Sequence, residues 1–289
     1  MRLYARALHA TARAQDIREQ AFSTYFLRNR AELELIGRLV RRRNDAGPLR
    51  ATVLGCSTGA EAYSVAWSVR SASRNAKMRL HAMDISRQAV EVAQRGEYSL
   101  VKADLTNTGI CDLMTPSEVD EMFVRDGNRL AVQPWIREGI EWHVGDAGDA
   151  KALDALGPQD MVVANNFLCH MSPAEAERCL VNIARLVAPG GYLFVSGVDL
   201  DVRTKVARDL GWTPLEELRE EIHAGDPGMA GFWPWHYAGV EPVDKARRDW
   251  QIRFCAAFRV GEVKSELAAN LNSEGSSAQE AEMAAQATR

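Results

Sequence analysis

Short apolar runs and helical patterns alternate along most of the chain. An apolar run at residues 49–54 breaks at Gly55, and a helical pattern resumes after Gly59. This order is typical of a buried strand, a tight glycine turn and the start of a helix. Further strands are expected at residues 79–83, 140–144, 160–164, 192–196 and 250–260. The alternation predicts an α/β fold with a doubly wound, mostly parallel sheet and right-handed crossovers.

The segments between these runs are expected to be helical or irregular. Helices are predicted at residues 61–72, 86–98, 173–187 and within 201–215, the last leading to a short strand around Trp212. The stretch from 99 to 129 shows no regular pattern, and Pro189-Gly190-Gly191 is expected to turn into the fifth strand.

Three parts of the chain are expected on pattern and composition. Residues 1–48 form an N-terminal helical segment, and residues 49–260 form the main domain, with an aromatic-rich insertion at about 216–250. Residues 261–289 are rich in Ala, Glu and Ser, so we expect a disordered tail. The amphipathic pattern of residues 1–20 suits a surface helix docked on the domain, or a membrane-surface or partner helix.

Composition excludes several classes of protein. The net charge of −4 over 289 residues gives no basic footprint for nucleic acid. No window approaches 18 consecutive apolar residues, so no membrane span is expected. The five cysteines are scattered and show no zinc-like spacing with histidine, so no metal site is predicted. Dispersed cysteines without a signal peptide indicate a reducing, cytoplasmic location.

The glycine turn at residues 55–59 is the first candidate site. In an open α/β sheet such a turn lies at the carboxyl edge, where ligands bind, although a glycine after a first strand can also serve packing alone. The second strand ends on Asp84, 25 residues after Gly59. A carboxylate there suits the two hydroxyls of a ribose, and it equally suits the cap of the helix that begins near Ser86.

Several motifs resemble one family. Residues 55–64 (GCSTGAEAYS) resemble the first motif of the CheR-type methyltransferases, S-adenosylmethionine-dependent enzymes that methylate receptor glutamates in bacterial chemotaxis. Further similar segments follow in order and approximate spacing, and the likeness covers roughly residues 22–200. They are Thr24-Tyr25-Phe26-Leu27-Arg28, Met83-Asp84-Ile85-Ser86 with Gly96-Glu97-Tyr98, and Asn165-Asn166-Phe167-Leu168-Cys169-His170 with Pro189-Gly190-Gly191-Tyr192-Leu193-Phe194.

The resemblance implies a Rossmann-like class I methyltransferase sheet with an antiparallel last strand, and S-adenosylmethionine as cofactor. It also implies that residues 1–48 pack over the cofactor site. The implied cofactor residues are Thr24, Arg28, Gly55, Ser57, Thr58, Gly59, Glu61, Asp84, Asp146, Ala147 and Asn165. Asp84 would hold the ribose, Asp146 and Ala147 would frame the adenine, and Thr24 and Arg28 would close over the methionine end.

The chain departs from the family pattern at several positions. The Glu and Pro that usually flank Glu61 are Ala60 and Ala62, the usual Arg is Asn165, and the usual Tyr is His170. About 20 residues precede the Thr24 segment, which we take as too few for the family's helical receptor-binding domain. No β-hairpin insertion of the kind that grips receptor tails is evident. The pattern therefore predicts a retained cofactor half and an altered substrate half.

The chemistry of the acceptor remains open at two residues. A carboxylate acceptor is ionised at neutral pH and needs a cation such as Arg28 to orient it, whereas a hydroxyl acceptor gains from a base such as His170. His170 is equally suited to packing, and His223 and His236 are more typical of structural histidines. The aromatic residues 232–237 suit either a lid over a small-molecule pocket or a hydrophobic plug.

Three functions follow from these observations. The leading hypothesis is methyl transfer to an oxygen acceptor, carboxylate or hydroxyl, on a small molecule or a non-receptor protein. The alternatives are a chemoreceptor glutamate O-methyltransferase and a catalytically silent S-adenosylmethionine-binding regulatory module. Arg28 and His170 are the candidate catalytic residues of the first.

Overall fold

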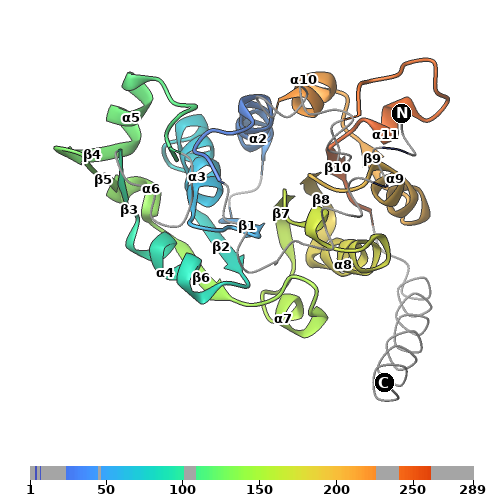
Figure 1. Cartoon of the computed structure of the whole chain (residues 1–289), viewed down its shortest axis with the longest axis horizontal. Coiled ribbons are helices and arrows are strands. Elements are labelled where there is room, and N and C mark those ends of the chain that lie inside the picture. The colour runs from blue at the N-terminus through green and yellow to red at the C-terminus, as the bar shows by residue number, and fades with distance from the viewer. Residues whose placement is uncertain are drawn as a thin grey trace.

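A seven-stranded sheet forms the centre of the protein in the computed structural model (Figure 1). The structure describes residues 4, 7, 24–44, 47–100, 109–225 and 241–261. The strand order is β6-β2-β1-β7-β8-β10-β9, and β10 runs antiparallel to both of its neighbours. The strands are β1 (Leu49–Leu54), β2 (Met78–Asp84), β6 (Ile140–Val144), β7 (Gln159–Asn165), β8 (Val187–Ser196), β9 (Thr213–Pro214) and β10 (Ala257–Arg259). The predicted α/β class, with a mostly parallel sheet and an antiparallel last strand, is confirmed.

The strand order reverses between β1 and β7, which are adjacent and parallel. β1 continues through α3 (Ala60–Ala72) into β2 on one side, whereas β7 continues through α8 (Pro173–Leu186) into β8 on the other. At such a switch point the two connections leave in opposite directions and open a crevice at the carboxyl ends of the strands. The glycine turn after β1 lies at this edge.

Side chains on the two faces of the main sheet belong to two separate apolar cores. Val53 of β1 belongs to the core that contains α2 (Arg30–Arg42) and α3, whereas the next residue, Leu54, belongs to the core of α8 and α9 (Leu200–Asp209). Successive side chains of a strand point to opposite faces of the sheet, so a strand that is buried on both faces needs apolar residues at consecutive positions. α4 (Arg87–Arg95) and α7 (Ala150–Asp154) complete the crossovers near β6.

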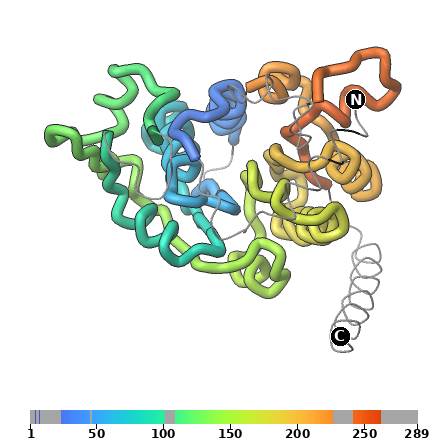
Figure 2. The backbone as a smooth tube through the Cα atoms, in the orientation of Figure 1, coloured from blue at the N-terminus to red at the C-terminus, as the bar shows by residue number. Residues whose placement is uncertain are grey.

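A second sheet of three antiparallel strands lies at the end of the molecule opposite β10 and α9 (Figures 1 and 2). Its strands are β3 (Glu97–Ser99), β4 (Phe123–Asp126) and β5 (Arg129–Val132), in the order β3-β5-β4, with α5 (Pro116–Met122) before β4 and α6 (Pro134–Arg137) after β5. The expectation of an irregular stretch without a β-hairpin insertion was wrong. Its strands are only three or four residues long, too short to produce a periodic pattern in the sequence.

One helix prediction and one strand prediction need correction. The helix expected at 86–98 ends at Arg95, because Gly96 adopts a left-handed conformation (φ 64°) that caps it. The strand expected at 250–260 begins instead as a short helix, α11 (Trp250–Arg253), before β10. Its last residue, Arg253, is buried and paired with Asp201 and Glu241, which an alternating strand pattern does not anticipate.

Other predictions keep their place in the fold or lie outside the described residues. The Pro189-Gly190-Gly191 segment is part of β8, where the register to β7 shifts. α10 (Arg219–Ala224) occupies part of the expected insertion. Most of residues 1–20, the aromatic segment 232–237 and the tail from 262 lie outside the described residues. Among the described helices, none combines the length and apolarity that crossing a bilayer requires.

Candidate cofactor and acceptor site

Asp84 fixes the glycine loop against the end of β2. Its Oδ2 accepts a hydrogen bond from the Ser57 backbone N–H at 2.7 Å, and its Oδ1 accepts one from the Ser86 N–H at 2.9 Å. The backbone N–H of Cys56 also donates to the Met83 carbonyl at 3.0 Å. Burial raises the pKa of Asp84, and the amide donors of Ser86 and Ser57 oppose that rise. The N-cap of α4 is Ser86, whose hydroxyl accepts from the Ala89 N–H, so the alternative of Asp84 as the helix cap was wrong. Asp84 instead holds the Ser86 and Ser57 backbones, and its remaining lone pairs can accept hydrogen bonds from a diol.

The two glycines of the loop are required by their surroundings. Gly59 is the N-cap of α3 with φ 96°, and a Cβ there would lie 2.9 Å from the Ala93 Cβ. Gly55 has φ 68°, and a Cβ there would lie 2.7 Å from the Phe167 ring. Since L-residues with side chains rarely adopt these angles, glycine serves both close packing and a tight turn at this edge. The packing and ligand-loop interpretations are therefore compatible.

Backbone strain gathers in the segments predicted to form the site. Among the described residues, four non-glycine residues have positive φ, and three of them are Leu27, Ser57 and Asn166. Leu27 precedes Arg28, Ser57 lies in the glycine loop, and Asn166 follows β7. Such conformations cost roughly 1–3 kcal/mol each and persist where the surroundings impose them, often at ligand sites. Three of the segments predicted to form the site, distant from one another in sequence, thus each contain a non-glycine residue with positive φ.

Asn165 is the hub of the site. At the end of β7, its side-chain amide donates to Glu32 Oε1 at 2.7 Å and to Glu61 Oε1 at 2.9 Å. Its carbonyl oxygen accepts from the Ser196 hydroxyl at 2.8 Å. One neutral amide therefore holds two carboxylates of different helices, α2 and α3, at the cofactor edge. This arrangement gathers two acidic side chains there, whose oxygens can accept hydrogen bonds from an ammonium.

Glu32 was missed from the sequence. It lies on α2 and is buried, with only 3% of its surface exposed. A signal existed, because Glu32 precedes Leu35 and Ile36 by three and four residues and therefore lies on the apolar face of the helix. A carboxylate on a buried helix face needs a polar partner. Asn165, 133 residues away in sequence, provides it.

The segment at residues 24–28 is fixed to the motif helix. The backbone N–H of Leu27 donates to the Ser64 hydroxyl on α3 at 2.9 Å, and Phe26 is buried in an aromatic cluster. Thr24 is buried, whereas Arg28 is half-buried with its guanidinium 5.9 Å from the Tyr25 ring centroid. This bond fixes the segment to Ser64, which follows Glu61 by three residues and therefore lies on the same side of α3.

The remaining predicted residues follow β6 and β7. Asp146 accepts a hydrogen bond from the Gly148 N–H at 2.8 Å, and its neighbour Ala147 is buried. The turn is joined to β2, since the Gly145 N–H donates to the Asp84 carbonyl at 2.9 Å. His170 is half-buried in the single helical turn η2 (Leu168–His170) after β7. All these positions lie beyond the carboxyl ends of parallel strands of the main sheet, in which β2 and β1 separate β6 from β7.

The residues present fit a ligand with a diol and positive charge. Asp84 offers acceptors to a diol, and Glu32 and Glu61 offer acceptors to an ammonium. The hydroxyl of Thr58 is buried in the loop and has no hydrogen-bond partner among the described residues. A buried hydroxyl without a partner is costly, and a ligand in the loop would relieve that cost. S-adenosylmethionine carries a ribose diol, an ammonium, a carboxylate and a sulfonium.

Comparison with known proteins supports the same assignment. Residues 23–205 match the family model described as the CheR methyltransferase, SAM binding domain. The chain is 28% identical over 161 residues to chemotaxis protein methyltransferase 1 of Pseudomonas aeruginosa, covering 53% of this chain and 56% of that protein. It is 27% identical over 177 residues to the probable biofilm formation methyltransferase WspC of the same organism, covering 60% and 40%. The matched segments span from 17% to 56% of the curated relatives' lengths.

A solved structure is more distantly similar. Magnesium protoporphyrin IX methyltransferase from Synechocystis, solved with bound S-adenosylmethionine, is 16% identical, with a TM-score of 0.38 over 64% of this chain and 69% of that one. Because the score is low, no detail of the site rests on it. The family match covers more than half of the chain and confirms the predicted family and its S-adenosylmethionine cofactor. This chain belongs to the CheR methyltransferase family.

Proposed function

We propose that this chain transfers a methyl group from S-adenosylmethionine to an oxygen atom, carboxylate or hydroxyl, of an acceptor. The observation that carries the proposal is the cluster at the carboxyl edge, where Asp84 and the Asn165 hub lie beside the anchored Arg28 segment. The first two suit the diol and the positively charged groups of the donor, and Arg28 supplies a cation that can bind a carboxylate, either that of the methionine end or that of an acceptor.

Each residue then has a role in binding or orientation. S-adenosylmethionine, when bound, supplies an electrophilic methyl group on sulfur. Asp84 would bind the ribose hydroxyls, and Glu61 with Glu32 would bind the positively charged end. Arg28 would orient an acceptor carboxylate through its planar pair of donors. Positioning and exclusion of water supply most of the rate acceleration for such an in-line displacement.

His170 matters only for an acceptor that loses a proton. A hydroxyl must give up its proton during or after attack, and an imidazole beyond β7 is suited to accept it. A carboxylate needs no such base. The dependence of the rate on His170 therefore separates the two acceptor classes.

The three-stranded sheet favours an acceptor carried by a protein. Two of its strands, β3 and β4, are edges that can pair with an extended peptide. β3 also contacts the cofactor loop directly, since the Tyr98 hydroxyl donates to the Thr58 carbonyl at 2.6 Å. The chemotaxis and biofilm methyltransferases named above are consistent with a protein carboxylate, which makes receptor glutamate methylation the second candidate.

Calorimetric titration with S-adenosylmethionine and S-adenosylhomocysteine tests the donor side, and the absence of binding to both would contradict the proposal. Radiolabelled methyl transfer tests the acceptor side. Base-labile label on protein indicates a carboxylate ester, whereas base-stable label on a small molecule indicates a hydroxyl acceptor. Cofactor binding without turnover on receptors, cell extracts or small acceptors would favour the silent module, which the changes at Ala60, Asn165 and His170 allow.

A further inference from the structure

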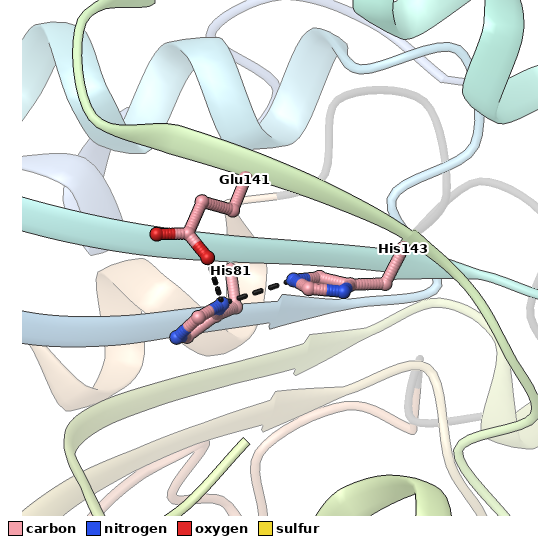
Figure 3. A group of neighbouring side chains, drawn as sticks. All are labelled: His81, Glu141 and His143. Carbon is pink, nitrogen blue, oxygen red and sulfur yellow. Dashed lines mark hydrogen bonds and ion pairs between the residues drawn. The ribbon is translucent and has the colours of Figure 1, made fainter. Parts of the chain in front are cut away.

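Three potential metal ligands converge on one face of the main sheet, away from the cofactor loop. His81 lies on β2, and Glu141 and His143 lie on the neighbouring edge strand β6. The parallel register places His81 opposite Glu141, and His143 follows two residues later. Residues at this spacing share a face of the sheet. Figure 3 shows the two β6 side chains directed toward the ring of His81.

The distances are close to those of a tetrahedral site. His81 Nδ1 lies 3.0 Å from His143 Nε2 and 3.6 Å from Glu141 Oε2. All three ligand atoms lie within 4.8 Å of one another. Zinc bonds of about 2.0–2.1 Å in a tetrahedron separate the ligand atoms by roughly 3.3–3.4 Å. Side-chain rotations that move these atoms by about an ångström or less would bring them to that spacing.

An outer residue orients the Glu141 carboxylate toward the two histidines. Arg79 Nε donates to Glu141 Oε1 at 2.7 Å, which leaves Oε2 directed toward His81. Hydrogen bonds from outer residues commonly orient a ligating carboxylate in this way.

We propose that His81, Glu141 and His143 bind one divalent transition-metal ion of the Zn²⁺ class. Two imidazoles and one carboxylate suit zinc and its neighbours better than calcium or magnesium, which prefer oxygen ligands. The Glu141 side chain is 43% exposed, so water can reach a fourth coordination position. The bound ion replaces the hydrogen bond between the two histidines and joins the edge strand to β2.

This site lies on the strands that carry the adenosine end of the cofactor site. His81 precedes Asp84 by three residues on β2, and His143 precedes Asp146 by three residues at β6. An ion at this point therefore fixes the two strands whose ends supply both carboxylates. We expect the metal to raise the thermal stability of the chain and to tighten its binding of S-adenosylhomocysteine.

The test uses tag-free, full-length protein stripped of metal and titrated with Co²⁺ and then Zn²⁺. Visible cobalt bands report tetrahedral coordination, and competition with a chromogenic chelator reports zinc affinity. We expect one ion per chain, tetrahedral bands without a thiolate charge-transfer band, and a higher melting temperature with Zn²⁺. Substituting a residue that only supports a metal ligand commonly weakens metal affinity by about 10–100-fold. Removing a ligand should cost more, so we expect His143→Ala and Glu141→Gln each to lower zinc affinity by at least about that factor.

His170→Ala is the matched control, because it removes a half-buried histidine outside the cluster, and its zinc affinity should equal that of the wild type. Glu141→Gln keeps the shape of the side chain, so it remains informative if His143→Ala does not fold. Equal affinity of wild type and both variants would overturn the proposal, as would octahedral cobalt bands or a thiolate band that places the ion on cysteine.

Discussion

The donor and acceptor sides of the candidate site are held in different ways. On the donor side, Asp84 and Asn165 end parallel strands, and short hydrogen bonds to backbone or buried groups fix them. On the acceptor side, Arg28 and His170 lie in turns and remain half-buried. Strand ends define positions accurately for a constant cofactor, whereas turns allow the acceptor side to vary. The predictions below test this division, beginning with the largest expected effect.

Asp84→Ala should cause the largest loss on the donor side. The substitution removes the acceptors for two ribose hydroxyls and leaves the Ser57 and Ser86 amides without their carboxylate. Hydrogen bonds to a charged group contribute roughly 1.5–3 kcal/mol each, so affinity for S-adenosylhomocysteine should fall about 100-fold or more. Calorimetric titration measures the change. The Asp84→Asn variant keeps the shape of the side chain, so its affinity for S-adenosylhomocysteine should lie between those of the wild type and Asp84→Ala. An affinity of Asp84→Ala within threefold of the wild type would contradict the proposed role of Asp84.

Arg28→Ala should mainly affect turnover. Losing a cation that orients the acceptor should lower kcat/KM roughly 100-fold, whereas S-adenosylhomocysteine affinity should change less than about tenfold. Methyl-transfer assays and calorimetry on the same variant measure both quantities. Arg28→Lys retains charge without the planar pair of donors and should recover only part of the rate. The reverse outcome, lost cofactor binding with normal turnover at saturation, would assign Arg28 to the donor side.

The donor side could be predicted further from the sequence than the acceptor side. The glycine loop, Asp84 and Asn165 each lie at the end of an apolar run that is long and regular enough to be predicted as a strand. In a parallel sheet the carboxyl ends of such strands lie at one edge. Glu32 was missed because its partner is 133 residues away. The three-stranded sheet was missed because its strands are three or four residues long. The histidine pair was missed because 62 residues separate two ligands that only strand pairing brings together.

Asn165→Leu should test the hub through stability. The change removes the amide that donates to both the buried Glu32 and the half-buried Glu61. Hydrogen bonds to charged groups contribute roughly 1.5–3 kcal/mol each, so we expect a loss of about 2 kcal/mol in urea unfolding. Adding Glu32→Gln should recover part of the loss, since it removes one of the charges. Simple additivity of the two substitutions would exclude this coupling.

A histidine outside both sides should set part of the pH dependence of stability. Burial lowers the pKa of His223 to about 4 from 6.5, and its Nε2 lies 2.7 Å from the Glu241 carbonyl oxygen. Between these values the unfolded chain binds a proton that the folded chain does not. The free energy of unfolding should therefore fall as pH decreases through this window, by about 1.4 kcal/mol per pH unit at most.

His223→Gln should flatten this slope below pH 6.5 in urea unfolding measured from pH 7 to 5. Tyr63→Phe, which removes a buried hydrogen bond and no imidazole, is its control and should leave the slope unchanged. If His170→Ala changes the pH profile of methyl transfer and His223→Gln does not, the titrating group of the reaction lies on the acceptor side. An unaltered slope in His223→Gln would show that other groups titrate in this window.

Tyr98→Phe should give the smallest effect and probes the connection between the two sides. The Tyr98 hydroxyl, on β3 of the small sheet, donates to the Thr58 carbonyl in the cofactor loop, and burial raises its pKa well above the usual value, so it stays a donor. Losing this bond should cost about 1 kcal/mol of stability and weaken S-adenosylhomocysteine binding about fivefold. Tyr63→Phe, which removes a bond to Ala93 instead, is the matched control and should lose stability with less effect on affinity.

The Tyr98→Phe variant also tests whether a protein acceptor that contacts the small sheet is linked to the cofactor site. Binding of such an acceptor should change the cofactor affinity of the wild type more than that of Tyr98→Phe, because the Tyr98 bond connects the two sites. Equal shifts in both proteins would mean that the acceptor and the donor sides are independent.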